Sequence, residues 1–382
     1  MFKFDFDVED DSVEEAKLDI NENAEPAPDE RSFEEHSLQD LIQALPDDVS
    51  YSSVQVGGVN VPRRDLFDVR LQLMASEAQT DNQTDKAKGD QAAIEFASRP
   101  SDLVPRVYEG GMKTWECSLD LAAYVLDQDA QGKKILELGC GTAMPSLAIL
   151  QKLLNQGAPN TESNTTVFHL QDYNSSVLEY VTLPNIILVW FFSKAGEPYR
   201  ATIPPPSPKP DSKKLPVVSN LTLESVPEEE EEEERVEKSD QSPMSFDPHA
   251  FKMTEPGDLA FTPSLRSAFL DSLAAHRIQL GFFSGPWDGF HPKAPYDLVL
   301  TSETIYQPTS LPSLVRLLQE ATNPTGKCLV AAKMVYFGVG GGIREFEKAL
   351  EQNRGSAKCV WEQREGVGRS ILQVISSTSL SR

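Results

Sequence analysis

The sequence predicts an α/β fold with a doubly wound, mostly parallel sheet that has an antiparallel end. Apolar stretches typical of buried strands alternate with stretches of helical spacing over the second half of the chain. The chain then finishes in two neighbouring strand patterns, 358–365 and 369–376, which are close enough to pair with each other. An earlier strand, Lys134–Leu138, ends in a Gly-x-Gly turn. In such sheets, ligands bind at the carboxyl ends of the strands.

The Gly-x-Gly turn marks the first predicted ligand site. Ile135, Leu136 and Leu138 form a short buried strand, which Gly139 and Gly141 interrupt. The apolar residues that follow the turn repeat at helical spacing. Because glycine has no Cβ, the backbone at Gly139 and Gly141 can approach a ligand closely. We therefore expect a nucleotide-like ligand here.

The other elements follow from the same patterns. We expect helices at 37–45, 119–126, 177–181 (with Ser175 as its N-cap), 265–276, 311–321 and 343–350. We expect strands at 54–56, over 59–73 by its alternation, and at 165–169, 279–284, 295–303 and 328–332.

The formal charge of −24 is concentrated in two segments. Residues 1–100 carry a net charge of −15 and residues 196–260 a net charge of −8, which leaves −1 for the rest. We expect 1–100 to be acidic and mostly disordered, with short elements, and 196–261 to be a disordered Pro/Glu-rich insertion. The folded domain is then 101–195 and 262–382. Because this domain is nearly neutral, it lacks the basic footprint of a nucleic-acid binder.

Cysteine spacing and hydropathy exclude other classes of protein. The four cysteines lie far apart and form no CxxC pair, so we expect neither a zinc site nor a disulfide framework, and no metal. We find no apolar run of about 18 residues and no amino-terminal signal sequence. We expect a soluble intracellular protein with reduced thiols.

The residues around the turn favour S-adenosylmethionine over a dinucleotide. A dinucleotide fold has a third glycine where this chain has Met144, and an acid about 20 residues further on. Here the acid that ends the next strand is Asp172, 33 positions beyond Gly139. Methyltransferases of the seven-strand class carry an acid two positions before the first glycine, as Glu137 does. They also carry one at the end of the second strand, where Asp172 would hold the ribose hydroxyls.

Further motifs occur in one order along the chain. They are Lys113-Thr-Trp-Glu-Cys117, Gln171-Asp-Tyr-Asn174, Val181-Thr-Leu-Pro-Asn185, Gly285-x-Trp287, Leu300-Thr-Ser-Glu-Thr-Ile-Tyr306 and Lys333-x-x-Tyr-Phe-Gly-Val-Gly-Gly-Gly342. Together they resemble the histidine protein methyltransferase family, whose relatives include lysine methyltransferases of the same seven-strand class. The resemblance covers 101–195 and 262–376, and the last two motifs are the most specific. The insertion at 196–260 departs from the compact family core.

The resemblance implies a class I methyltransferase sheet of seven strands, with S-adenosyl-L-methionine as cofactor. It implies a substrate histidine, methylated on a ring nitrogen, in a large-subunit ribosomal protein. We expect this basic protein as partner, no sequence-specific nucleic acid, no membrane, a monomeric enzyme, and a location in cytoplasm and nucleus. The expected cofactor-binding residues are Trp115, Glu116, Cys117, Ser118, Glu137, Gly139, Gly141, Asp172, Tyr173, Asn174, Gly285, Pro286, Trp287 and Ser302.

Glu303 and Tyr306, just past a strand end, are the expected catalytic residues. A neutral imidazole, with a pKa of about 6.5, is already nucleophilic at pH 7 and needs no strong base. A carboxylate on the far ring N–H would orient the ring and stabilise its developing charge, which suits Glu303. Tyr306 would line the pocket of the substrate ring or form a hydrogen bond with the ring. Two alternatives stay open: lysine methylation, since lysine enzymes share the fold and an acid-x-x-Tyr motif, and a non-enzymatic acidic chaperone for a basic ribosomal protein.

Overall fold

The computed structural model describes residues 32–77, 110–160, 164–203, 253–292, 294–336 and 340–376. The predictions for residues 1–31 and 78–109 and for most of the acidic insertion lie outside the described residues.

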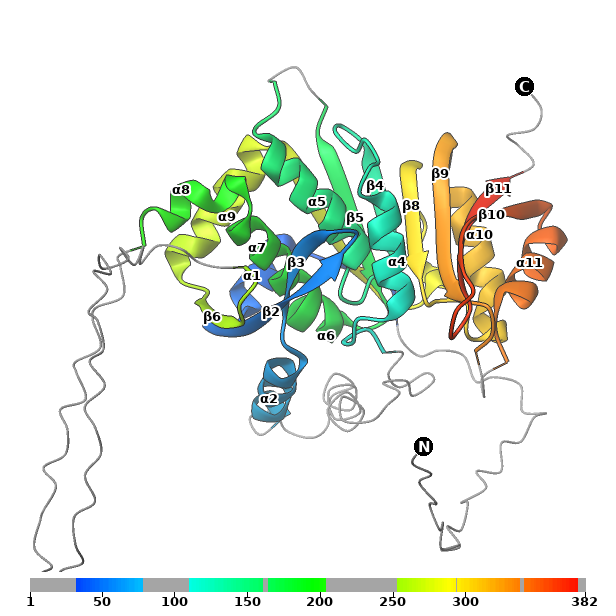
Figure 1. Ribbon diagram of the computed structural model, residues 1–382, viewed down its shortest axis with the longest axis horizontal. Coiled ribbons are helices and arrows are strands. Elements are labelled where there is room, and N and C mark those ends of the chain that lie inside the picture. The colour runs from blue at the N-terminus through cyan, green and yellow to red at the C-terminus, as the bar shows by residue number, and fades with distance from the viewer. Residues whose placement is uncertain are drawn as a thin grey trace, which may run out of the picture.

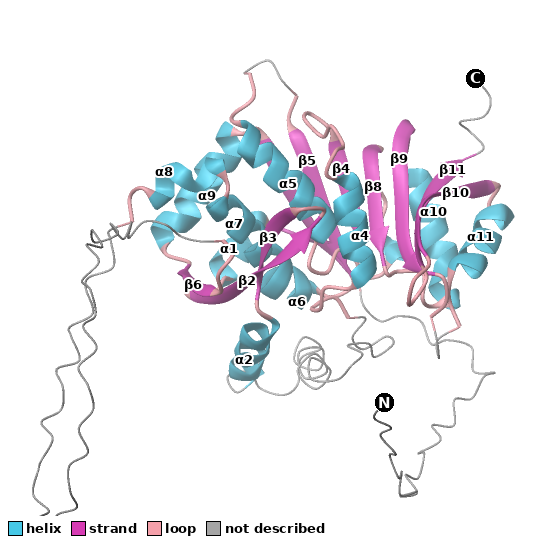
Figure 2. Cartoon of the chain, viewed as in Figure 1, coloured by secondary structure: helices cyan, strands magenta, loops and turns pink. Residues whose placement is uncertain are grey.

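A large sheet forms the centre of the described structure (Figures 1 and 2). Its strands are β1 (Glu34–His36), β4 (Lys134–Leu138), β5 (Thr166–Asp172), β7 (Ile278–Ser284), β8 (Tyr296–Ser302), β9 (Thr322–Lys333), β10 (Gly355–Gln363) and β11 (Arg369–Ser376). They are ordered β1-β7-β5-β4-β8-β9-β11-β10. The five from β7 to β9 pair in parallel, whereas β1 at one edge and β11 with β10 at the other are antiparallel. The predicted fold class is confirmed.

Helices cover both faces of this sheet (Figure 2). The first hydrophobic cluster includes residues of α1 (Leu38–Ala44), α4 (Glu116–Val125), α5 (Met144–Gln156), α7 (Leu183–Phe192) and α9 (Pro263–Ala275). The second includes residues of α10 (Leu311–Ala321) and α11 (Ile343–Gln352). Side chains alternate between the two along a central strand: Leu329 joins the first, whereas Cys328 and Val330 join the second. The core therefore lies on both faces, and the strand ends stay available for a site.

One continuous helix runs from residue 175 to residue 192, where we expected a helix only over 177–181. It consists of α6 (Ser175–Val177), a π-helical turn, Leu178–Thr182, and α7. Ser175 is its first residue, and the N-cap is Asn174, so the predicted cap was wrong. Among the described helices it is the one long and apolar enough to span a membrane, with a mean hydropathy of 1.4. However, 83% of it is buried in the fold, as expected of a core helix.

A proline shapes this helix without breaking it. Pro184 has no N–H to donate to the carbonyl of Tyr180, one turn earlier. The Arg64 guanidinium donates to that carbonyl instead, over 2.8 Å, from an element far away in the sequence. Arg64 is buried and also pairs with Asp68 over 2.6 Å, so its charge is compensated.

A second sheet orders β3 (Val59–Arg64), β2 (Asp48–Val56) and β6 (Gly257–Ala260). The predicted alternation over 59–73 is right for β3 and wrong beyond it, where the chain forms α2 (Leu66–Glu77). Val69 and Leu73, four positions apart, lie on one face of this helix and are buried against Val177 and Val181. The segment forms a helix because this face packs against Val177 and Val181, and a local sequence pattern contains no information on such a distant contact.

We expected the folded part to start near residue 100, but it begins well before that position. β1 adds to the edge of β7, and β2 pairs with β6, so residues 34–56 share both sheets with the rest of the domain. Ile42 and Val49 are buried although the segment is acidic overall. Composition misled here because a few apolar residues suffice when a preformed sheet supplies the other half of the contact.

Shorter elements are Lys194–Gly196, α8 (Glu197–Arg200), Trp287–Gly289 and Pro308–Ser310.

Candidate active site

The glycine turn after β4 lies against the end of β5. The Asp172 carboxylate accepts a hydrogen bond from the Gly141 N–H over 2.9 Å and one from the Asn174 N–H over 3.2 Å. Asp172 is 5% exposed, and Asn174 is buried. A carboxylate has about four acceptor positions, a chemistry that suits the binding of ligand hydroxyls. The structure therefore brings together Gly141, Asp172 and Asn174, three of the predicted cofactor residues.

Close approach explains why the turn needs glycine. Gly139 and Gly141 have φ values of +58° and +51°, a left-handed backbone that other residues rarely adopt. A Cβ on Gly139 would lie 2.6 Å from a methyl carbon of Thr304, and one on Gly141 would lie 2.9 Å from the carbonyl oxygen of Gly111. The turn is thus pressed between two loops, and it presents backbone rather than side chains.

Gln171 is a site residue that the sequence analysis did not assign. Its side-chain oxygen accepts from the Gly139 N–H over 3.3 Å and from the Trp287 indole N–H over 2.9 Å. Its amide nitrogen donates to the Gly285 carbonyl over 2.8 Å. A fully buried amide thus ties together the turns after β4 and β7. A polar residue next to the acid at the end of a buried strand was the available signal.

The turn after β7 lies beside Asp172, as predicted. The Gly285 N–H lies 3.1 Å from the Asp172 carbonyl and 3.2 Å from the Tyr173 carbonyl, both acceptors. Pro286 is the next residue, and Trp287 is half-buried and held by Gln171. The contacts with a cofactor that we predict for Tyr173, Pro286 and Trp287 stay predictions.

Glu137 points from β4 into the core rather than into an open site. It is 1% exposed, and one carboxyl oxygen accepts from the Ser146 N–H at the start of α5, over 2.9 Å. Its other oxygen has no hydrogen-bond partner among the described residues. Burial raises the pKa of Glu137 to about 8, against the opposing effect of the Ser146 hydrogen bonds. The neighbouring Asp172 raises it further.

Glu303 begins the loop after β8 and is held on both oxygens. One oxygen accepts from the Tyr336 hydroxyl over 2.7 Å, and the other lies 3.4 Å from the donating N–H of Cys117. Glu303 has φ +57°, a strained conformation for a residue with a side chain, and its own N–H donates to the Ala331 carbonyl over 2.9 Å. Burial, then the charge of Glu303, raises the pKa of Tyr336, so its hydroxyl stays a donor.

Lys333, at the carboxyl end of β9, completes this cluster. Its ammonium lies 3.5 Å from Glu303 and 3.4 Å from Glu116, and 4.9 Å from the centre of the Trp115 ring. Lys333 and Tyr336 belong to the last of the sequence motifs, but the motif alone predicts no role for them. Their place directly after a buried strand, at the same sheet edge as Glu303, was the signal that could have found them.

The remaining predicted residues are Tyr306, Ser118, Ser302 and Cys117. Tyr306 and Tyr336 have ring centres 6.3 Å apart in an edge-to-face arrangement. Ser118 is buried and donates to the Trp115 carbonyl over 2.7 Å, and Ser302 is the last residue of β8. Burial raises the pKa of the Cys117 thiol well above its usual range, so this cysteine is not a nucleophile. Their predicted contacts with a cofactor stay predictions.

The residues around Asp172 and the residues around Glu303 are contiguous. Thr304 follows Glu303 and packs against Gly139. On the other side, the Thr114 hydroxyl donates to the Thr142 hydroxyl over 3.2 Å and joins the loop before Trp115 to the glycine turn. The carboxyl ends of β4, β5, β7, β8 and β9 therefore form one continuous site. Among the described residues, no cluster of His, Cys, Asp or Glu could hold a metal ion.

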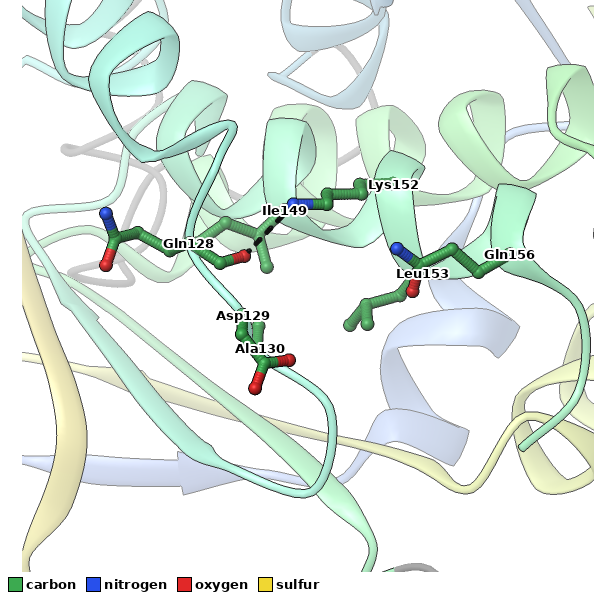
Figure 3. A pocket seen from close by; sticks show the side chains of 7 residues that line it. All are labelled: Gln128, Asp129, Ala130, Ile149, Lys152, Leu153 and Gln156. Carbon is green, nitrogen blue, oxygen red and sulfur yellow. Dashed lines mark hydrogen bonds between the residues drawn. The ribbon is translucent and has the colours of Figure 1, made fainter. Parts of the chain in front are cut away.

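A cavity of about 220 Å³ lies at the opposite end of the sheet (Figure 3). It is lined by Gln128, Asp129, Ala130, Ile149, Lys152, Leu153 and Gln156. The Lys152 ammonium donates to the Leu126 carbonyl over 2.9 Å and to the Gln128 carbonyl over 3.3 Å. None of the predicted site residues lines this cavity, and its lysine already holds the loop before β4.

The site fits S-adenosylmethionine by its own chemistry. Gly139 and Gly141 form a turn without side chains at this edge, and Asp172 offers a buried carboxylate, a group that accepts hydrogen bonds from ribose hydroxyls. These residues would hold the cofactor at the carboxyl edge of the sheet.

The strand order and this site define an S-adenosylmethionine-dependent methyltransferase of the seven-strand class. Curated relatives carry the comparison further. Histidine protein methyltransferase 1 of Schizosaccharomyces pombe is 32% identical over 358 residues, with 89% of this chain and 84% of the relative covered. The protein of the same name from Saccharomyces cerevisiae is 30% identical, with 76% and 68% covered. This chain therefore belongs to the histidine protein methyltransferase 1 family, and the resemblance seen in its motifs is confirmed.

Other comparisons add little. No family model matches the chain. Among solved structures, a ribosomal protein L11 methylase from Lactobacillus delbrueckii is 9% identical, with 70% of this chain and 83% of that chain covered and a TM-score of 0.32. A magnesium protoporphyrin IX methyltransferase from Synechocystis with bound SAH, also 9% identical, covers 68% of this chain and 81% of its own, with a TM-score of 0.34. Scores this low support no inference about this chain.

Proposed function

We propose that this chain is a protein-histidine N-methyltransferase that modifies a ring nitrogen in a large-subunit ribosomal protein. The histidine acceptor is supported by the name of its relatives, and the ribosomal protein by the motif resemblance alone. The observation that carries the proposal is the Glu303 carboxylate, held next to the glycine turn at the carboxyl edge of the sheet.

When bound, S-adenosylmethionine supplies an electrophilic methyl group on a positively charged sulfur. The acceptor nitrogen of a neutral imidazole would attack that methyl carbon as S-adenosylhomocysteine leaves, so this chain needs no strong base. Its task is to hold the ring in line and to keep the attacking nitrogen free of a proton.

Glu303 would perform this task by accepting a hydrogen bond from the N–H at the far side of the ring. That contact fixes the tautomer in which the attacking nitrogen has a lone pair. As the methyl group is transferred, the ring becomes a cation, and the nearby carboxylate stabilises the developing charge. The ring then releases a proton to solvent, and the methylated histidine leaves neutral. Tyr306, beside Tyr336, would form a wall of the acceptor pocket.

The charge distribution supports a basic partner. Residues 1–100 carry a net charge of −15, and an acidic surface attracts a basic protein by long-range electrostatics. We propose that the enzyme acts as a monomer on such a protein in the cytoplasm and nucleus, without sequence-specific nucleic-acid binding or membrane attachment. The complete set Glu137, Gly139, Gly141, Asp172 and Glu303 favours an enzyme over a non-enzymatic chaperone.

The test uses the purified full chain with S-adenosylmethionine that carries a radiolabelled methyl group, and a lysate of cells that lack this activity. Labelled proteins are identified, and their acid hydrolysate is separated to distinguish methylhistidine from methyllysine. We expect methylhistidine in one basic ribosomal protein. Recovery of methyllysine alone would overturn the histidine acceptor in favour of the lysine alternative. Methylhistidine in a non-ribosomal protein would overturn only the choice of substrate.

A further inference from the structure

The ammonium of Lys333 occupies a compact site of opposite charge. Glu116, from the start of α4, and Glu303, from the loop after β8, approach it to 3.4 and 3.5 Å. The Trp115 ring lies below it, at 4.9 Å. The side chains of Lys333 and Glu303 are only 19% and 11% exposed, whereas that of Glu116 is 58% exposed. Two carboxylates and an indole face are together a strong ammonium site.

The backbone fixes Lys333 in this place. It is the last residue of β9, and its register partner on β11 is Arg369. The Arg369 guanidinium pairs with Asp120 over 2.6 Å, so this cation is already engaged elsewhere. The Lys333 N–H also donates to the Tyr336 hydroxyl over 3.3 Å, and this hydroxyl in turn donates to Glu303. Lys333 therefore contacts Glu303 directly through its ammonium and indirectly through the Tyr336 hydroxyl.

Lys333 stays charged in this setting. Burial by itself lowers the pKa of Lys333, but the nearby carboxylates of Glu303 and Glu116 together outweigh burial and raise it. The Cys117 thiol also faces this group, and burial keeps it protonated. The two carboxylates therefore have a permanent internal counter-ion throughout the range of pH in which an enzyme works.

We propose that Lys333 determines acceptor specificity by occupying, from within the chain, the ammonium site that a substrate lysine would need. This rests on the proposed function, because it assumes that the acceptor enters beside Glu303. A lysine side chain arrives as an ammonium and finds its counter-ions taken and a like charge next to them. A neutral imidazole needs only one hydrogen-bond acceptor, which Glu303 still offers. Lys333 acts here as a positioning and specificity residue and touches no reacting atom.

Three substitutions test this in the full-length enzyme. Lys333→Met keeps the length of the side chain and removes its charge, and Lys333→Gln does so with a polar side chain in case the first variant does not fold. Lys333→Arg keeps the charge. The matched control is Lys327→Met, on the same strand, whose ammonium bonds the Gln128 side chain away from the site. Thermal melting verifies folding, and calorimetry verifies cofactor binding.

The readout is the ratio of methyllysine to methylhistidine formed in the lysate assay with radiolabelled cofactor. We expect this ratio to rise about tenfold or more in Lys333→Met or Lys333→Gln, because an uncompensated carboxylate pair attracts an ammonium. We expect Lys333→Arg and Lys327→Met to keep the wild-type ratio, and Lys327→Met to keep the wild-type cofactor affinity. An unchanged ratio in a folded neutral variant would overturn this inference and leave the proposed function intact. Methyllysine alone from the wild-type enzyme would overturn the proposed function itself.

Discussion

The Asp172 carboxylate accepts a hydrogen bond from the backbone N–H of Gly141 over 2.9 Å. The acid that ends β5 is therefore linked directly to the glycine turn that ends β4. A carboxylate held by backbone donors is fixed in orientation before any ligand arrives, so little ordering is left for the binding step. This relationship makes the two motifs, 31 positions apart, testable as a pair.

Asp172→Asn should weaken cofactor binding. The amide replaces one carboxylate oxygen by an NH2 donor, so the side chain loses its negative charge and half of its acceptor positions. We expect a loss of about 1–3 kcal/mol in binding free energy, which calorimetry with S-adenosylmethionine measures. Asp271→Asn, the same change at an exposed position of α9, is the control and should bind normally. Equal affinity of both variants would remove Asp172 from the cofactor site.

Gly141→Ala should destabilise the fold by more than backbone strain alone. The new Cβ would lie 2.9 Å from the Gly111 carbonyl oxygen, at a φ of +51°. At Gly366, with a φ of +70°, a Cβ would have no atom of the described residues within 4 Å. Gly366→Ala therefore adds backbone strain of about 1–2 kcal/mol without a clash. We expect Gly141→Ala to lower the free energy of unfolding in urea clearly further than Gly366→Ala does. If the two variants are equally stable, the close approach of the loops is wrong.

Glu303→Gln should lower kcat while cofactor affinity stays the same. Glutamine keeps the shape of the side chain but loses the charge that stabilises a cationic ring, so we expect a decrease on the order of 100-fold. Single-turnover assays with labelled cofactor measure the chemical step. The control is Glu320→Gln on α10, where the carboxylate pairs with Arg316 and is 50% exposed. Near-normal turnover by Glu303→Gln would show that another group orients the acceptor.

The cofactor-free protein should lose stability as the pH rises toward 8. Burial raises the pKa of Glu137 to about 8 from its ordinary value of 4.5, so the folded chain keeps a proton that the unfolded chain releases. This contribution is complete below the unfolded pKa and is lost as the pH rises through the folded pKa, at roughly 1.4 kcal/mol per pH unit at most. Thermal melts of wild type and Glu137→Gln between pH 5 and 8.5 measure it. The variant should show a flatter profile, and parallel profiles would contradict an ionisable, buried Glu137.

Local patterns predicted the elements whose signals are complete within a few residues. The turn after β4, Asp172 at the end of β5 and the antiparallel end of the sheet all belong to this kind. The helix α2 does not, because its apolar face gains meaning only against Val177 and Val181. The early start of the folded part was missed for the same reason, since β1 needs β7 as its partner.

The acceptor side of the site was only half predictable. Glu303 and Trp115 were found through motifs, but the contact between Glu303 and the Cys117 N–H spans 186 positions. No local pattern contains such a pairing. The ion pairs of Lys333 depend on three loops that meet at one edge of the sheet. The position of each loop at that edge is predictable from the sequence, but the pairs of side chains that neutralise one another are not.

The edge strand β1 has a consequence for how the chain is made. His36 on β1 bonds Ser284 at the end of β7, 248 positions later, over 2.7 Å. A ribosome that adds roughly 5–20 residues per second releases β1 on the order of 10–50 s before β7 has been translated. The Phe33 ring, which stacks on Phe283 and Phe290 in the finished protein, has to wait for both of them during that interval. The part of the sheet that is synthesised first is therefore among the last to be completed.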